Sequence, residues 1–539
     1  MNAEGLKRAC PTLAGTIAAT LENQGAERFE DADAFYLKPH GIYQYDDRDA
    51  RRSGTRKYFY MVRVRIPGGV LSPAQYLALD ELADRHGNGT LRITSRQGIQ
   101  FHGVPKGNLQ PLVKSINEAG LTTLAACGDN NRNVVAPPSP ATDGLGALVR
   151  QHAQQVALAL APQTPAYRAV WLEQRQLDTD TEAAKNFCDP LYGAGYLPRK
   201  FKVAFAIPPQ NDVDIFSHCC GFVAIADGRG DLLGYNLLAG GGMGRSHGNK
   251  ATFPRLADVI GFLPPHKVVE VARAVLTIHR DFGDRTNRRH ARLKYVLAER
   301  GAEWCRRELE SRLGFALGEP RPFQFERQGD LFGWHTQADG QLFLGIFVET
   351  GRIRGQQKKL LRKVVGQFGP QVRLTPNSNL ILTNIAPQSR PDMDCLLEDV
   401  TAPVTPLRRA CMACVALPSC GQAIAEAERF LPELITGMER LWDETGLGGE
   451  EVTVRMTGCP NGCARPYTAE IGLVGKSLGL YQIWLGGNRA NTRLNRLYRD
   501  MVKASDIIGE LRPLLVRYKA ERQPDECFGD WAARAVQFP

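Results

Sequence analysis

Four cysteines in two close pairs constrain this chain more than any other feature of its sequence. Five residues separate Cys414 from Cys420, 38 residues follow, and three residues then separate Cys459 from Cys463. Each pair can present two thiolates from one loop to a single soft centre, and the pattern therefore predicts an iron–sulfur cluster. Zinc is the weaker alternative, because structural zinc pairs usually have two to four residues between their ligands.

The segments around these cysteines support a rigid, hydrogen-bonded centre. Residues 423–442 read AIAEAERFLPELITGMERLW and have the apolar periodicity of a helix, which would hold the two loops a fixed distance apart. Pro418, Pro460 and the turn at Asn461 would leave backbone N–H groups free to bond cluster sulfurs. Cys411, a fifth cysteine beside the motif, is expected to be a bystander.

The cysteine motif resembles that of the siroheme and 4Fe–4S sulfite and nitrite reductases. The closest resemblance, carried by ACVALPSCGQAIAEAERFLP and VRMTGCPNGCARPYTAEIGLVGK, is to the hemoprotein (beta) subunits of assimilatory NADPH-dependent sulfite reductases, and it extends over about residues 41–531. It implies that Cys463 bridges the cluster to the siroheme iron. It also implies the full set of cluster ligands: Cys414, Cys420, Cys459 and Cys463.

Charge and cysteine usage limit the function classes. The formal net charge is +10, but the basic residues are scattered without a Lys/Arg tract, so nucleic-acid binding is not expected. A positive field suits an anionic substrate, a carboxylate-rich cofactor or an acidic redox partner. The 13 cysteines are irregularly spaced and no apolar run reaches 18 residues, which predicts a soluble, cytoplasmic protein without a membrane partner.

The order of the predicted elements indicates a duplication. Residues 59–104 predict a strand, a glycine turn, a helix and a strand pair, and residues 342–385 repeat this order. A strand-rich segment that ends in glycines follows each block, over 197–244 and 452–489. We therefore predict an α+β fold of two pseudo-twofold halves, and the resemblance implies the sulfite/nitrite reductase fold with a cofactor cleft between them.

The predicted domains follow from the duplication and the resemblance. They are an N-terminal arm (1–58), a ferredoxin-like repeat domain (59–125 with 335–408), a siroheme-binding α+β domain (126–334), and an α+β domain that binds the 4Fe–4S cluster and siroheme (409–539).

Six-electron reduction of sulfite to sulfide needs a cofactor, because no side chain supplies electrons in this way. The protein must still bind a small oxyanion and deliver protons, which suits cations without acidic partners. In LPRKFK, alternation places Lys200 and Lys202 on one face of a strand, and lysine can also donate a proton. The alternative for each cation is an exposed position on a solvated face. The resemblance implies four anion-binding, catalytic residues: Arg63, Arg132, Lys200 and Lys202.

Siroheme carries eight carboxylates, so its pocket should be rich in basic side chains and backbone amides. Glycine turns would let backbone N–H groups approach those carboxylates. His290 stands where the family pattern has asparagine, and the neighbouring Arg288, Arg289 and Arg292 are expected to compensate. The cofactor-binding residues implied by the resemblance are Arg96, Gln100, His102, Arg199, Gly240, Gly241, Gly242, Asn287, Lys294, Asn461, Asn488 and Arg489.

Three function classes compete. A noncatalytic cluster protein does not explain the basic stretches, which leaves reduction of sulfite or of nitrite to ammonia. The nitrite reductases resemble LPRKxN where this chain has Lys202, so the extra cation favours sulfite. No P-loop or dinucleotide-binding fingerprint is present. The resemblance implies an NADPH-oxidising flavoprotein (alpha) subunit as electron donor, with ferredoxin as the alternative.

Overall fold

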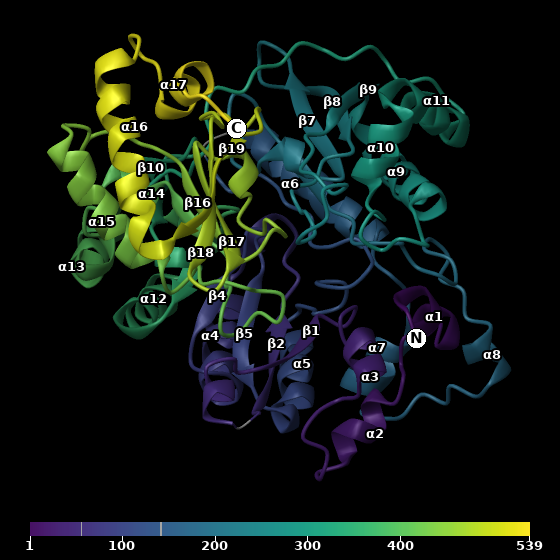
Figure 1. Ribbon diagram of the computed structural model, residues 1–539. Helices are drawn as coiled ribbons and strands as arrows, with labels where there is room; N and C mark the ends of the chain where they lie inside the picture. Colours follow the sequence, from purple (N-terminus) through teal and green to yellow (C-terminus); the bar gives the residue numbers. More distant parts are fainter. Residues whose placement is uncertain (55, 141–142) are drawn as a thin grey trace.

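Four β-sheets organise the chain (Figure 1). The computed structural model describes residues 1–54, 56–140 and 143–539. Helices cover the sheets, so the α+β class is as predicted. None of the helices in the described part of the chain combines the length and the apolar character that spanning a bilayer requires.

Two five-stranded sheets form the repeat domain and exchange a strand with each other. Their orders are β1-β2-β5-β4-β12 and β10-β11-β14-β13-β3. The short strand β3 pairs with β13 of the other half, and β12 pairs with β4 in the same antiparallel way. The strands are β1 Ile42–Asp46, β2 Tyr58–Arg63, β3 Val70–Leu71, β4 Leu91–Ile93, β5 Ile99–Val104, β10 Gly333–Thr336, β11 Leu342–Ile346, β12 Arg352–Ile353, β13 Gln371–Leu374 and β14 Leu380–Ile385.

A glycine precedes each exchanged strand. Gly69 and Gly351 have φ of +73° and +77°, a left-handed conformation that favours glycine. A Cβ on Gly69 would lie 2.6 Å from the Leu374 carbonyl oxygen, and one on Gly351 would lie 2.9 Å from that of Ile93. The same close approach therefore recurs in both halves, which confirms the predicted duplication.

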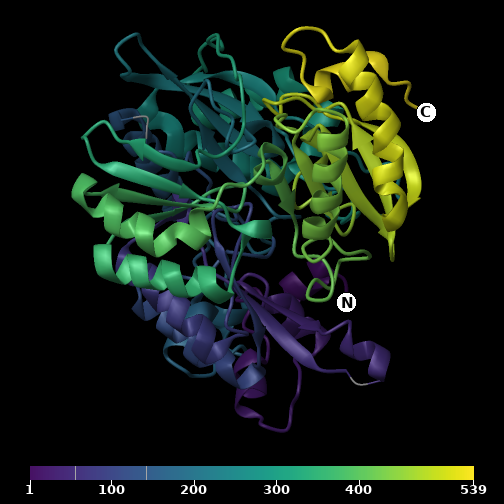
Figure 2. The same cartoon turned by 90° about the vertical axis from the view of Figure 1, so that its left-hand side faces the viewer.

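The helices of the repeat domain pack on one side of the molecule. Helix α4 (Pro73–His86) lies beside its counterpart α12 (Gly355–Phe368), with α5 (Leu109–Glu118) and α13 (Arg390–Thr401) flanking them (Figure 2). The Lys358 ammonium of α12 lies 3.4 Å from Asp80 and 2.7 Å from Asp84 of α4, which joins the two repeats at this surface.

The two other sheets are also built alike. One has the order β6-β7-β8-β9 and the other β15-β16-β17-β18-β19, and in both a parallel pair is followed by antiparallel strands. These strands are β6 Val203–Ala206, β7 Cys220–Ala226, β8 Leu232–Ala239, β9 Asp258–Leu263, β15 Cys411–Ala413, β16 Val454–Thr457, β17 Ile471–Ser477, β18 Leu480–Leu485 and β19 Arg496–Lys503. The remaining helices are α1 Ala3–Ala9, α2 Ile17–Glu22, α3 Asp31–Tyr36, α6 Asp143–Ala159, α7 Pro165–Tyr167, α8 Glu182–Lys185, α9 Val268–Phe282, α10 Leu293–Arg300, α11 Ala302–Leu313, α14 Pro406–Arg409, α15 Leu431–Glu444, α16 Ile507–Glu521 and α17 Phe528–Ala535.

Two sequence predictions differ from the structure. The helix predicted over 423–442 begins only at Leu431, because the N–H groups of Ile424 and Ala425 donate to the Gly458 carbonyl and tie this segment to the second cysteine loop. Strand β1 falls inside the predicted N-terminal arm, yet it pairs with β2. That part of residues 1–58 therefore belongs to a sheet.

Candidate active site

Adjacent parallel strands bring the two cysteine pairs together. Strands β15 and β16 end at the same edge of their sheet, with Cys414 directly after β15 and Cys459 two residues after β16. The Gly458 N–H donates to the Cys414 sulfur at 3.4 Å, and the Asn461 side-chain amide donates to the Cys459 sulfur at 3.5 Å. Two of the sulfurs therefore accept hydrogen bonds from the motif, one from a backbone N–H and one from the Asn461 side chain.

The four thiols form one electrostatic group. Burial raises the pKa of Cys414 well above its usual value, and the charges of Cys463 and Cys459 raise it further. Burial and Cys463 likewise raise the pKa of Cys459 to about 12. Thiolates that oppose one another's ionisation need a positively charged centre, and an iron–sulfur core is such a centre. In the described parts of the chain no three His, Cys, Asp or Glu side chains are placed to hold a single metal ion.

Cys411 lies apart from this group, as expected for a bystander. It is in strand β15, and its thiol donates to the Leu407 carbonyl at 3.0 Å. Burial raises the pKa of Cys411 far above its usual value, so this thiol stays protonated.

A hollow of about 330 Å³ joins the cysteine motif to Arg96, Lys202 and Arg292, which lie more than 100 residues earlier in the chain. Cys463 opens onto it opposite cations from both halves. Within the described chain, its lining includes no Asp or Glu. The lining residues are Ser95, Arg96, Lys202, Ser217, His218, Met243, Gly244, Arg292, Asn461, Gly462, Cys463 and Arg465.

Lys202 lines this space, and Lys200 lies on the same side of its segment, as the alternation predicts. Phe201 between them is buried and forms a parallel bridge with Asn131, so the two lysines project to the other side. Burial lowers the pKa of Lys202 to about 7, and the charges of Arg96 and Arg292 add to this effect. Burial and neighbouring cations also lower the pKa of Lys200 well below its usual value.

Arg63 and Arg132 converge from different elements. Both guanidinium groups reach the Ala126 carbonyl, at 3.4 and 3.5 Å, and Arg63 also donates to the Cys127 sulfur at 3.0 Å. Gln100, opposite Arg63 in the β2–β5 ladder, accepts from the Arg63 Nε at 2.9 Å when its amide oxygen faces that residue. In that orientation its NH₂ donates to His102 at 3.2 Å.

Arg96 is fixed at the edge of the hollow. Its guanidinium donates to the carbonyls of Asn133 at 3.1 Å and Val203 at 3.0 Å, and it lies 3.2 Å from the His218 Nδ1. Burial lowers the pKa of Arg96 to about 9. A bound polycarboxylate would offset this crowding of cations, so the donor set fits siroheme.

The glycine loop after β8 has a different role from the predicted one. The N–H groups of Gly240, Gly241 and Gly242 donate to the protein carbonyls of Cys219, His218 and Arg255, and so they are not available to cofactor carboxylates. Lys294 is also occupied, because its ammonium donates to the Gly242, Gly244 and Phe253 carbonyls. These residues shape the loop, and Met243 and Gly244 are the members that face the hollow.

Three further predicted cofactor contacts lie outside the hollow. Asn287 is exposed in a turn, Asn488 hydrogen-bonds Thr492, and Arg489 is 48% exposed near Glu450. They extend from surface loops after α9 and β18, and they are not among the residues that line the hollow with Cys463.

The basic residues near His290 make different contacts. His290 stacks on Tyr295, with 3.9 Å between ring centroids, and Arg289 is exposed. Arg292 lines the hollow. Arg288 instead pairs with Asp129 at 2.7 Å.

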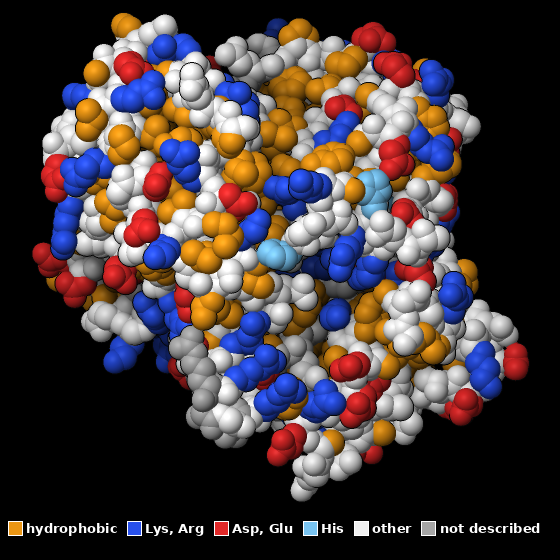
Figure 3. All heavy atoms as spheres, in the orientation of Figure 1, with side chains coloured by type: hydrophobic (Ala, Val, Ile, Leu, Met, Phe, Trp, Pro, Cys, Tyr) orange, Lys and Arg blue, Asp and Glu red, His pale blue; other side chains and the backbone are white. Residues whose placement is uncertain are grey.

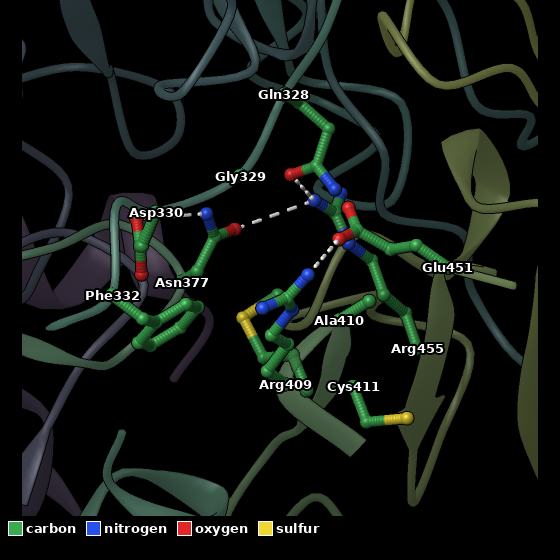
Figure 4. Close-up of a pocket in the computed structure, with 11 residues that line it drawn as sticks. Gln328, Gly329, Asp330, Phe332, Asn377, Arg409, Ala410, Cys411, Glu451 and Arg455 are labelled. Atoms are coloured by element: carbon green, nitrogen blue, oxygen red, sulfur yellow. Dashed lines mark hydrogen bonds and ion pairs between the residues drawn. The ribbon is translucent and has the colours of Figure 1, made fainter. Parts of the chain in front are cut away.

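A second hollow lies where the duplication places the counterpart of the first (Figure 4). Asn377 has the same position after β13 as Arg96 has after β4. In the same way, Glu451 before β16 corresponds to Lys200 before β6, and Asp212 after β6 corresponds to Cys463 after β16. Its volume is about 360 Å³, and its arginines are balanced by Asp330 and Glu451. It has neither a counterpart of the Cys463 thiol nor the excess of cations, so the first hollow suits an anionic iron cofactor better.

His218, Arg465 and Ser217 line the first hollow although no sequence pattern indicated them. These residues line the hollow because the segment between β6 and β7, which carries Ser217 and His218, lies opposite the turn that carries Arg465. Only the folded chain shows that these two segments are close. Many further Lys and Arg side chains lie on the face drawn in Figure 3, in keeping with the net charge of +10.

Comparisons with known proteins agree with this geometry. The Nitrite/Sulfite reductase ferredoxin-like half domain matches residues 51–119 and 335–400, and the Nitrite and sulphite reductase 4Fe-4S domain matches residues 152–317. The chain is 46% identical to the sulfite reductase (NADPH) hemoprotein beta-component of Myxococcus xanthus, over 99% of this chain and 96% of that protein. It is 45% identical to the protein of the same name from Geobacillus kaustophilus, over 99% and 95%. The solved structure of the Mycobacterium tuberculosis NirA protein shares the fold, with a TM-score of 0.81 at 24% identity over 99% and 96% of the chains.

Proposed function

This chain belongs to the nitrite and sulfite reductase family, and from this premise we propose that it is the hemoprotein subunit of an assimilatory sulfite reductase. It carries siroheme and a 4Fe–4S cluster and reduces sulfite to sulfide. The observation that supports this best is the hollow in which Cys463 faces Arg96, Lys202 and Arg292.

The cofactors are held by residues from both halves. Cys414, Cys420, Cys459 and Cys463 would bind the cluster, and Cys463, which opens onto the hollow, would also bind the siroheme iron. When bound, the two groups supply electrons to the sulfur atom. Residues of the segments 126–334 and 409–539 line the hollow together with Ser95 and Arg96 of the segment 59–125.

The siroheme carboxylates need cations at the rim of this hollow. Arg96 and Arg292 line it, and Arg199 precedes Lys200 in the same bridged segment. Gln100 and His102 lie beside Arg63, and Asn461 lies beside Cys459. We assign the carboxylate contacts to Arg96, Arg199 and Arg292.

The substrate anion is bound by Arg63, Arg132, Lys200 and Lys202. Arginine offers a planar set of donors to an oxyanion, whereas a buried lysine also gives up a proton readily. Because the pKa of Lys202 is lowered to about 7, its ammonium can supply a proton near neutral pH. Among the described residues, no acidic side chain lines the hollow that Lys202 enters, so its charge remains available to an anion.

An NADPH-oxidising flavoprotein partner agrees with the names of the relatives, and a cytoplasmic location agrees with the free cysteines. Nitrite is the second candidate substrate, disfavoured by Lys202.

The purified protein should show siroheme and cluster absorbance together and should oxidise reduced methyl viologen with sulfite. Turnover with NADPH alone would contradict a separate donor, and a protein without siroheme bands would contradict the proposed function.

A further inference from the structure

A buried carboxylate, Asp129, lies between the segments that carry the proposed anion-binding residues Arg132 and Lys200. Asp129 precedes the segment that carries Arg132, and its side chain is only 5% exposed. The Leu197 N–H donates to the Asp129 carbonyl at 3.2 Å, and the Phe201 N–H donates to that of Asn130 at 3.0 Å. The carboxylate therefore lies at the junction of the two segments that present the anion-binding cations.

The N-terminal helix α1 supplies a cation to this junction. The Lys7 side chain is 2% exposed, and its ammonium lies 3.1 Å from the Asp129 carboxylate. It also donates to the Leu197 carbonyl and to Glu4, both at 2.7 Å. These three acceptors hold Lys7 in one orientation, and two of them, Asp129 and Leu197, lie far from it in the sequence.

Arg285 holds the same helix from the other side. Its guanidinium pairs with Glu4 at 2.6 Å and donates to the carbonyls of Tyr196 at 2.7 Å and Gly195 at 3.1 Å. The Tyr196 hydroxyl donates to the Pro11 carbonyl at 3.1 Å. The N-terminal segment and the loop before Lys200 are therefore joined at several points.

The charges at Asp129 explain why a buried lysine is needed there. Asp129 binds Arg288 through two contacts, at 2.7 and 3.0 Å, whereas Arg199 is 3.8 Å away. Lys7 and Arg288 together occupy the carboxylate, and the more distant Arg199 can face an anion. Without Lys7, Asp129 would keep Arg288 as its one close cation, and its charge would draw Arg199 closer and make the potential at the anion site less positive through a poorly screened, buried path.

We propose that Lys7 is a positioning residue for sulfite binding: it locks the loop 195–202 and keeps Asp129 from opposing the anion. This inference rests on the proposed anion site. The charge of Lys7 acts through Asp129, and its three hydrogen bonds fix the register of the lysine segment against Arg132.

The test uses the complete enzyme with its electron donor. Lys7→Met should raise the KM for sulfite at least about fivefold while kcat changes less than about twofold, because binding rather than chemistry is affected. Siroheme and iron content should stay at the wild-type level. Arg8→Met is the matched control, since Arg8 carries the same charge on the same helix but is exposed, and its KM should not change.

A double variant separates charge from loop packing. Lys7→Met with Asp129→Asn removes both charges and should bring the KM back toward the wild-type value, which a purely structural role of Lys7 would not produce. Hydrogen exchange of the backbone amides over 195–202 should be faster in Lys7→Met than in Arg8→Met. If Lys7→Met does not fold, Glu4→Gln, which removes one Lys7 acceptor charge, should raise the KM about twofold.

Lys200→Ala distinguishes failure of this inference from failure of the proposed function. A raised KM in Lys200→Ala with an unchanged KM in Lys7→Met, or in Glu4→Gln where that variant replaces it, overturns the role of Lys7 alone. An unchanged KM in Lys200→Ala overturns the anion site, and the role of Lys7 falls with it. A double variant that is worse than Lys7→Met refutes the charge argument.

Discussion

Asp214 and Arg465 occupy equivalent positions in the two halves of the chain and form an ion pair with each other. Each lies eight residues after the end of a strand, β6 or β16, and each has a left-handed backbone, with φ of +51° and +56°. Their side chains are 2% and 6% exposed. The duplication has therefore diverged to opposite charges at one position, and the resulting pair joins the halves beside the hollow.

The first prediction is that Asp214→Asn destabilises the protein strongly. Asp214 also accepts from Arg455 at 2.8 Å, so the change leaves two buried guanidinium groups without this countercharge. Breaking a buried pair from one side costs about 3–5 kcal/mol. Urea unfolding should show this loss. Glu444→Gln, which breaks the exposed pair with Arg512, should cost at most about 1 kcal/mol, and equal losses would refute the argument.

The second prediction separates cluster ligands from the bystander thiol. Cys459→Ser should abolish the cluster and leave siroheme poorly retained, because the four thiols act as one electrostatic group. Cys411→Ser should keep both cofactors, since its thiol points to the Leu407 carbonyl and lies apart from that group. Iron and acid-labile sulfide analysis measures both outcomes. Full cluster content in Cys459→Ser, or its loss in Cys411→Ser, would mean that the ligand set is wrong.

The cysteine motif and the duplication could be predicted because both depend on short-range order in the sequence. The spacing within each cysteine pair is local, and the repeated strand–turn–helix pattern contains the glycines that the close approach of the halves requires. The alternation around Phe201 likewise placed Lys200 and Lys202 on one face without knowledge of the tertiary structure.

Contacts between residues far apart in the sequence could not be predicted. Nothing local indicates that β3 and β12 pair with the opposite half, or that the turn carrying His218 faces Cys463. The helix predicted from Ala423 starts late, because tertiary hydrogen bonds to Gly458 override its apolar periodicity. The glycines 240–242 match the expected loop, but their N–H groups point to protein carbonyls.

The third prediction concerns pH and applies to protein produced without siroheme. Lys202 has a folded-state pKa of about 7, below the usual 10.5, so between these values the unfolded chain binds a proton that the folded chain does not. The contribution of Lys202 to the free energy of unfolding should therefore rise as the pH is raised from about 7 toward 10. Lys202→Met should reduce that slope, which urea titrations at several pH values can measure. Lys114 is exposed, so Lys114→Met is the control and should leave the slope unchanged.

The last prediction tests the choice of substrate through Lys202. Near neutral pH sulfite is partly doubly charged, whereas nitrite carries one charge, so a cation in a partly dry pocket matters more for sulfite. Losing one charge-assisted contact costs about 1.5–3 kcal/mol, or roughly one to two powers of ten in binding.

Lys202→Asn, which matches the nitrite-type pattern, should lower sulfite turnover at least about tenfold and lower nitrite turnover much less. The siroheme spectrum should persist, because Arg96 and Arg292 still line the hollow. Steady-state rates with both anions, measured on this one variant, separate the possible roles. Unchanged rates for both anions would make Lys202 a residue outside the site. Equal losses for both would instead assign it to proton delivery, which its lowered pKa also permits, and the preference for sulfite would then have to come from Lys200, Arg63 or Arg132.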